Sequence, residues 1–72
     1  MLDEKEISPM LKTNEVARLL NVHINTVRRW SNGGILRAYR ISARGDRRFE
    51  RIDVLNLLLE QPELVRSQKV PM

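Results

Sequence analysis

Two short stretches in the first half of the chain repeat apolar residues at helical spacing, and three residues separate them. In the first stretch, Val16, Leu19 and Leu20 recur at intervals of three and four residues along one helix face. This pattern predicts a helix over about residues 14–20, with Thr13 as its N-cap and Asn21 in the left-handed conformation that ends it. The second stretch predicts a helix over residues 24–32, ended by a pair of glycines.

The second predicted helix divides into an apolar face and a polar face. A helical wheel centred on Val27 places Ile24, Trp30 and Ser31 on the same side. The remaining arc holds hydrogen-bonding or cationic side chains: Asn25, Thr26, Arg28, Arg29 and Asn32. Two short helices joined by a tight turn are typical of a helix-turn-helix, whose second helix enters the major groove of DNA.

Alternating residues after the glycines predict a β-hairpin with strands over residues 37–42 and 47–49 and Gly45 in its turn. We expect one side of the hairpin to bury Tyr39, Ile41 and Phe49, and the other side to expose Arg40, Ser42 and Arg48. The predicted fold is therefore mainly α with a small β-hairpin, a winged helix-turn-helix.

A third helix is predicted over residues 51–60, with an apolar face that completes the core: Ile52, Leu55, Leu58 and Leu59. Pro62 follows, and proline disfavours helix in the residue before it. We therefore expect one domain over residues 11–60, between flexible tails over residues 1–10 and 61–72.

Positive charge is concentrated in the middle third of the chain. Residues 21–51 contain eight arginines and only two acidic residues, whereas acidic residues slightly outnumber basic ones on both sides of this stretch. Arginine suits phosphate oxygens and guanine edges better than lysine does, because its guanidinium is a planar fork of donors. Concentrated arginine next to a polar helix face indicates a nucleic-acid partner.

Composition argues against several other classes of function. The 72-residue chain has no cysteine and one histidine, His23, so we expect no metal site, no cofactor and no disulfide. It has neither a phosphate-cradling glycine loop nor a histidine–carboxylate pair at useful spacing, which speaks against an enzyme. No apolar run approaches the roughly 18–20 residues of a membrane span, so we expect a cytoplasmic, nucleoid-associated protein without a membrane partner.

Side-chain chemistry suggests which residues read the bases. Asparagine can bond bidentately to adenine and arginine to guanine, so Asn25, Arg28 and Arg29 are the candidate base readers. Thr26 can contact a thymine methyl or a phosphate.

The combined pattern resembles a known family. Residues 11–22 (LKTNEVARLLNV) and 25–30 (NTVRRW) resemble the helix-turn-helix of the excisionase-type branch of the MerR superfamily. Residues 38–41 (AYRI), 45–49 (GDRRF) and 53–54 (DV) resemble the wing and third helix of that branch. The resemblance covers about residues 11–60. It implies DNA binding by a recognition-helix set, Asn25, Thr26, Arg28 and Arg29, and by a wing set on phosphates or in the minor groove, Arg40, Arg44, Arg47 and Arg48.

Two departures from the family pattern matter. Many relatives have serine or aspartate at the position of His23, so we expect a weaker N-cap on the recognition helix. Full MerR regulators continue into a long dimerisation helix and an effector domain, for which the 72 residues leave no room. We therefore expect no small-molecule effector.

Three functions remain open on the sequence. The leading one is a MerR-like transcriptional regulator that binds a specific double-stranded DNA site. The second is an excisionase-like recombination directionality factor, which needs the same surface. The third, from another class, is a protein-interaction module of the antitoxin or anti-regulator kind. Because one small module binds one half-site weakly, we also expect further copies of the protein on repeated DNA sites.

Overall fold

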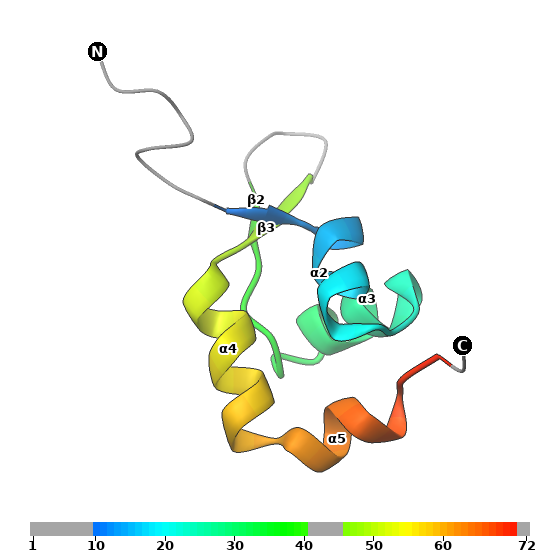
Figure 1. The fold of residues 1–72 in the computed structure, drawn as a ribbon. Coiled ribbons are helices and arrows are strands. Elements are labelled where there is room, and N and C mark those ends of the chain that lie inside the picture. The colour runs from blue at the N-terminus through cyan, green and yellow to red at the C-terminus, as the bar shows by residue number, and fades with distance from the viewer. Residues whose placement is uncertain (1–9, 41–45, 71–72) are drawn as a thin grey trace.

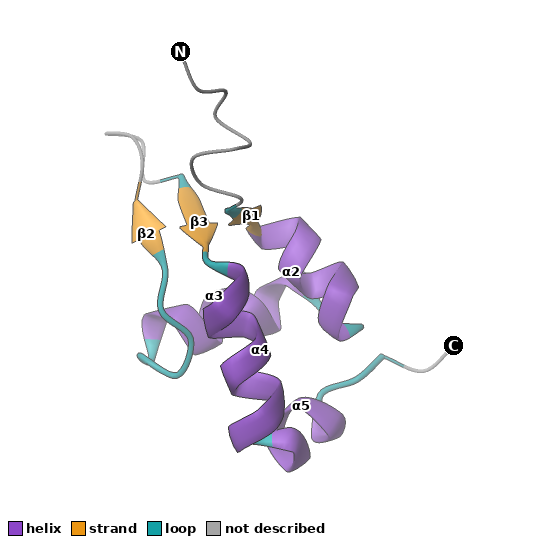
Figure 2. Ribbon diagram, turned by 60° about the vertical axis from the view of Figure 1, so that its left-hand side comes forward, coloured by secondary structure: helices purple, strands orange, loops and turns teal. Residues whose placement is uncertain are grey.

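The computed structural model describes residues 10–40 and 46–70 (Figure 1). Along the chain its elements are β1 (Leu11–Lys12), α2 (Thr13–Leu20), α3 (Ile24–Asn32), β2 (Tyr39–Arg40), β3 (Arg47–Phe49), α4 (Arg51–Glu60) and α5 (Pro62–Ser67). In these residues four short helices surround a core, and a small three-stranded sheet lies at one end (Figures 1 and 2). This is the mainly α, winged helix-turn-helix architecture that the sequence predicts.

The turn between α2 and α3 depends on Asn21. Its backbone is left-handed, with φ 57° and ψ 49°, a conformation that asparagine tolerates better than most residues. The chain reverses there, and the Val22 N–H donates to the Ala17 carbonyl at 3.0 Å. Ala17 is buried, and its small side chain lets the two helices lie close together. The predicted bounds of α3 are confirmed.

The start of α2 differs from the prediction by one residue. Lys12 occupies the N-cap position and Thr13 is the first helical residue. The Glu15 carboxylate accepts a 2.7 Å bond from the Lys12 backbone N–H, which satisfies a donor at the helix start. Glu15 thus supports this helix by a hydrogen bond as well as by its charge.

The sheet contains a strand that the sequence pattern did not predict. β1 pairs with β3, which also pairs with β2, so β3 is the central strand of an antiparallel sheet (Figure 2). Leu11 lies opposite Phe49, and Tyr39 lies opposite Arg48. The turn of the hairpin, with Gly45, is in the stretch 41–45 that lies outside the described residues.

This register corrects the predicted faces of the hairpin. Residues directly opposite each other in antiparallel strands share a face. Arg40 therefore shares a face with Arg47, and through the two-residue alternation with the buried Phe49. Tyr39 and Arg48 share the other face, so the predicted grouping of Tyr39 with Phe49 is wrong.

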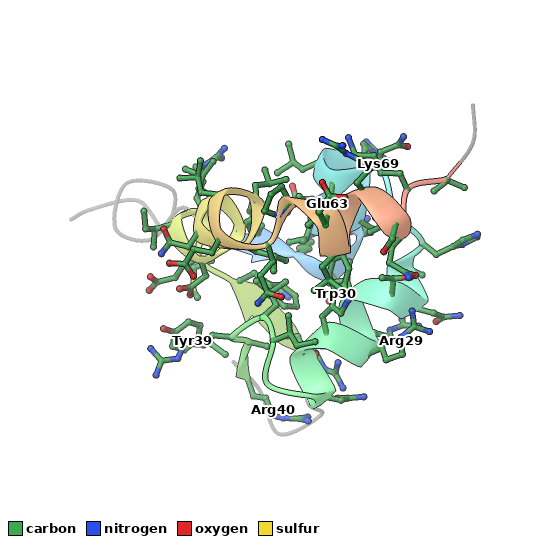
Figure 3. All side chains as sticks on the ribbon, turned by 90° about the horizontal axis from the view of Figure 1, so that it is seen from below. Arg29, Trp30, Tyr39, Arg40, Glu63 and Lys69 are labelled. Atoms are coloured by element: carbon green, nitrogen blue, oxygen red, sulfur yellow. The ribbon has the colours of Figure 1, made fainter. Side chains whose placement is uncertain are left out.

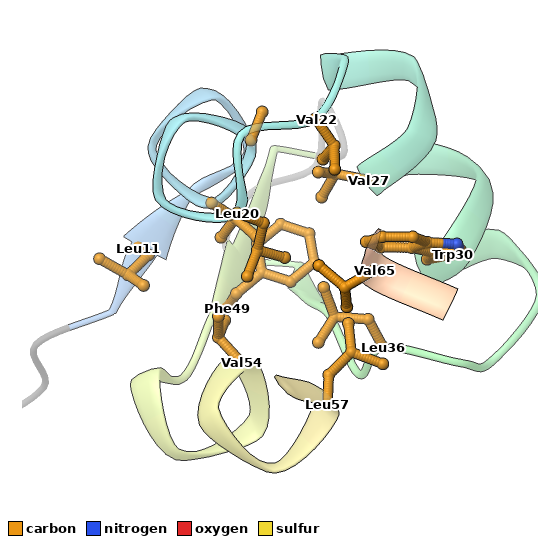
Figure 4. Packing of buried hydrophobic residues seen from close by; sticks show 12 residues of the cluster. Leu11, Leu20, Val22, Val27, Trp30, Leu36, Phe49, Val54, Leu57 and Val65 are labelled. Atoms are coloured by element: carbon orange, nitrogen blue, oxygen red, sulfur yellow. The ribbon is translucent and has the colours of Figure 1, made fainter. Parts of the chain in front are cut away.

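The core collects apolar side chains from β1, β3, all four helices and the loops between them (Figure 4). The fully buried Phe49 ring lies in the middle of the cluster. From α4 the core takes Val54 and Leu57, not the residues that the sequence suggested. The predicted core face of this helix is wrong, since Ile52, Leu55, Leu58 and Leu59 are all exposed.

The predicted flexible tail after residue 60 is also wrong for much of its length. Pro62 starts α5, where its fixed φ and missing N–H are compatible with the first turn of a helix. α5 inserts Val65, 1% exposed, into the core. Burial of this apolar side chain stabilises the packing of α5 against the other helices. Residues 1–9 of the predicted N-terminal tail lie outside the described residues.

Candidate nucleic-acid interface

The outward face of α3 carries the base-reading candidates. Val27 and Trp30 are buried on its inner side, which leaves Asn25, Arg28 and Arg29 exposed on the outer side. Arg28 and Asn25 are three residues apart, and the Arg28 guanidinium donates to the Asn25 Oδ1 at 3.2 Å. These polar side chains thus form one continuous strip along the helix.

Thr26 does not belong to this strip. Its side chain is buried at 5% exposure, because α2 packs along α3 and widens the covered side of the helix beyond the arc around Val27. The prediction that Thr26 contacts DNA through its side chain is therefore not compatible with its position. The expected weak cap is observed: within the described residues, the His23 side chain makes no capping bond to α3.

Arg47 of the predicted wing set connects β3 to α3. Its Nη1 donates to the Ser31 hydroxyl at 2.6 Å and approaches the Arg28 carbonyl at 3.4 Å. The Ser31 hydroxyl in turn donates to the Arg28 carbonyl at 3.0 Å. This contact, which we call the Arg47–Ser31 bridge, connects the sheet to α3 by side-chain hydrogen bonds.

The other wing arginines are placed differently from one another. Arg40 is exposed and shares the face of Arg47, so it lies on the side of the sheet that faces α3. Arg48 is on the opposite face, and its guanidinium donates to the Arg47 carbonyl at 2.9 Å. Arg44 lies outside the described residues. The structure thus brings Arg40 and Arg47 to the α3 side and turns Arg48 away.

The charge distribution separates two sides of the molecule. Described residues 24–40 and 46–49 contain six arginines and one acidic residue, Asp46. The acidic residues that follow Phe49 lie on α4, on α5 and at the residue before α4. Figure 3 shows Arg40 and Glu63 at opposite sides of the molecule, with α3 on the side of Arg40. The α3 side therefore presents the positive potential that a polyanion requires.

Two residues that the sequence pattern did not single out contact this strip. The Ser31 hydroxyl accepts a hydrogen bond from the Arg47 guanidinium. The Gln68 Oε1 accepts a 3.1 Å hydrogen bond from the Nη2 of Arg29. The helical wheel placed Ser31 on the side of Val27 and Trp30, and it gave no sign of the bonds of the Ser31 hydroxyl to Arg28 and Arg47. Gln68 is 39 residues from Arg29, and no local pattern connects residues so far apart.

Two other features of the described residues bear on the chemistry of the molecule. No group of three or more histidine, cysteine, aspartate or glutamate side chains in this part of the chain is arranged to hold a metal ion. None of the helices in the same residues has the length and apolar character needed to cross a membrane.

One of three comparisons with known proteins found a match. No curated protein and no solved structure matches the chain. The model of a protein family described as a helix-turn-helix domain does match, over residues 10–62, which include β1, the four elements that follow it and α4. The match covers well over half of the 72 residues, and the helix-turn-helix, the sheet and the arginine-bearing face all lie within it. The chain therefore belongs to the helix-turn-helix domain family and is a DNA-binding protein.

Proposed function

We propose that the protein regulates transcription by binding a specific sequence of duplex DNA with α3 in the major groove. The observation that carries this proposal is the exposed strip of Asn25, Arg28 and Arg29 beside Arg40 and the Arg47–Ser31 bridge. The buried side chains Val27 and Trp30 hold α3 in the core, so the exposed strip on its outer side is accessible to a ligand. A helix fits the major groove, which is about 12 Å wide.

Each residue of the strip has a role that its chemistry suits. Arg28 and Arg29 donate to the O6 and N7 acceptors of guanine, and Asn25 bonds to adenine. Since Arg28 contacts Asn25 in the free protein, the two side chains would read adjacent bases as a pair. Arg28 keeps further donors for a base edge while it holds Asn25 in place.

The sheet supplies contacts that carry no sequence information. Arg40 is exposed on the side that faces α3, where a phosphate next to the occupied groove would lie. Arg47 spends part of its donor capacity on Ser31 and retains the rest for a phosphate. The proposed interface excludes Thr26, because it is buried, and Arg48, because it lies on the other face of the sheet. A contact of Arg44 with DNA stays a prediction.

The binding proposal is tested by titrating labelled duplexes with the protein at several salt concentrations. Binding to phosphates releases counterions, and each phosphate contact contributes about −0.9 to the slope of log affinity against log salt concentration. Fluorescence anisotropy measures the affinity at each concentration. An affinity that does not change with salt would contradict the proposed interface.

The same surface would serve an accessory protein of site-specific recombination, and the excisionase-type resemblance favours that role equally. The two are separated by first selecting bound duplexes from a random pool and then testing the selected site. Altered expression of a reporter gene placed beside that site supports regulation, whereas a requirement for the protein in an excision assay supports recombination. The selection also reveals repeated half-sites, which the proposed binding of several copies requires.

A further inference from the structure

The C-terminal segment 62–70 folds back onto the helix-turn-helix. After α5, Gln68 reaches the recognition helix, where its Oε1 accepts the bond from Arg29. Lys69 forms a β-bridge with Val22 in the turn between α2 and α3. Figure 1 shows this end of the chain beside α3. Gln68 is thus the point at which the C-terminal segment meets the outer strip of α3.

Contacts on both sides of Gln68 fix its position. Before it, Val65 is buried in the core. After it, the Val70 N–H donates to the Asn21 carbonyl at 2.9 Å, and the Asn21 side-chain amide donates to the Val70 carbonyl at 3.4 Å. The backbone is held at both ends of a short span, so the fold itself places the Gln68 amide beside Arg29.

This placement affects what Arg29 can do. A guanidinium has five N–H donors, so one bond to Gln68 leaves donors for a base edge. An exposed arginine loses rotamer freedom when it binds, and a side chain already held in position loses less. The neutral amide also leaves the positive charge of Arg29 intact, whereas a carboxylate at this position would offset it.

We propose that Gln68 is a positioning residue for Arg29, so that the C-terminal segment contributes to base discrimination by the recognition helix. This inference rests on the proposed role of α3 in the major groove. Gln68 holds the Arg29 guanidinium over one base position and restricts its access to neighbouring phosphates. Discrimination at that position therefore depends on a residue outside the helix-turn-helix.

The test uses the full chain and the duplex selected above. Gln68→Met keeps the length of the side chain and removes the acceptor, and Gln61→Met is the matched control at the α4–α5 junction. We expect Gln68→Met to lower discrimination at the base read by Arg29 about three- to tenfold, the scale of one hydrogen bond. Thermal unfolding should be unchanged, because Gln68 adds no apolar burial to the core. The control should bind as the unchanged protein does.

A double-mutant cycle shows whether Gln68 acts through Arg29. In an Arg29→Met background, Gln68→Met should have no further effect on discrimination. Gln68→Glu retains the acceptor but offsets the charge, so it should weaken binding to all duplexes and reduce the salt slope by about 1. A purely structural role would lower stability without the loss of discrimination at the one base read by Arg29, so that loss identifies the positioning role.

Several results would overturn the inference. Additive effects of Gln68→Met and Arg29→Met would show that Gln68 acts independently of Arg29. If Gln68→Met discriminates at the base read by Arg29 as well as the unchanged protein does, the positioning role is rejected. The proposed function would then still stand. Failure of the unchanged protein to bind any duplex would reject the proposed function itself.

Discussion

α3 and α4 are built alike on their inner sides and differently on their outer sides. Each buries a short apolar stripe in the common core, with Val27 and Trp30 on α3, and Val54 and Leu57 on α4. The outer face of α3 is polar and cationic, whereas α4 exposes Ile52, Leu55, Leu58 and Leu59. The inner residues determine how a helix packs, and the outer residues determine what it can bind.

The comparison also explains why one helix was easier to interpret than the other. On α3 the apolar residues occupy one side only, so a helical wheel identifies a single face that can point into the core. α4 is apolar on both sides, and periodicity alone does not identify the inward side. The four larger side chains, Ile52, Leu55, Leu58 and Leu59, suggested the wrong face, because Val54 and Leu57 fill the space beneath Phe49.

The largest expected effect tests the inner faces. Replacing Trp30 on α3 with alanine should destabilise the protein by about 3–5 kcal/mol, and Leu57→Ala on α4 by about 2–5 kcal/mol, because each leaves a cavity. The free energy of unfolding is measured by urea denaturation. Leu55→Ala is the control on α4 and should cost far less, since Leu55 is 46% exposed. A larger loss for Leu55→Ala than for Leu57→Ala would reverse the orientation of α4.

The next effect concerns the outer face of α3. Arg29→Ala should weaken binding to the selected duplex by about 1–3 kcal/mol and relax preference at one base position, because a bidentate base contact is lost. Arg51→Ala, at the exposed start of α4, is the matched control. Affinities for the duplex and its single-base variants are measured by anisotropy. Equal losses from both replacements would mean that only overall charge matters.

A smaller effect tests the Arg47–Ser31 bridge, which connects α3 to the sheet. Arg47→Ala should lower the free energy of unfolding by about 1 kcal/mol, because a hydrogen bond between β3 and α3 is lost. Arg40→Ala should leave stability unchanged, because Arg40 is exposed and outside the bridge. Ser31→Ala should have little further effect once Arg47 is replaced. Full additivity of the two replacements would show that the bridge contributes nothing to stability.

The smallest expected effect concerns the outer face of α4. Ile52→Ser and Leu59→Ser should change stability by no more than about 0.5 kcal/mol, because both side chains are more than half exposed. DNA affinity should stay the same in both variants. Thermal denaturation and the anisotropy assay check both statements, and a marked loss of stability would show that this face is covered in solution.

Local chemistry was sufficient to predict much of the fold. The apolar face of α3 and Asn21 at the turn each act over a few residues, so they could be interpreted in isolation. The alternation after the glycines located the hairpin but not its faces, because these depend on the register of β2 with β3. The strand β1 could not be predicted, because its two residues become a strand only through pairing with β3. α5 was missed because Pro62 was interpreted as an end, although proline also starts helices.

The candidate interface was predictable to the same extent. Asn25, Arg28 and Arg29 follow from one helix and are exposed as expected. The burial of Thr26, the facing of Arg48 and the Gln68 contact depend on how α2, β3 and the C-terminal segment pack. Such tertiary information is absent from any single stretch of sequence.

The pairing of β1 with the central strand has a consequence for the DNA. β1 continues directly into α2, and Arg47 joins the same sheet to α3, so in the described residues the sheet is connected to both helices of the helix-turn-helix. In the proposed complex these connections hold α3 and the sheet at a set separation, so that the duplex makes any adjustment. Target sites rich in easily kinked pyrimidine–purine steps should then bind more tightly, even at base pairs that no side chain touches.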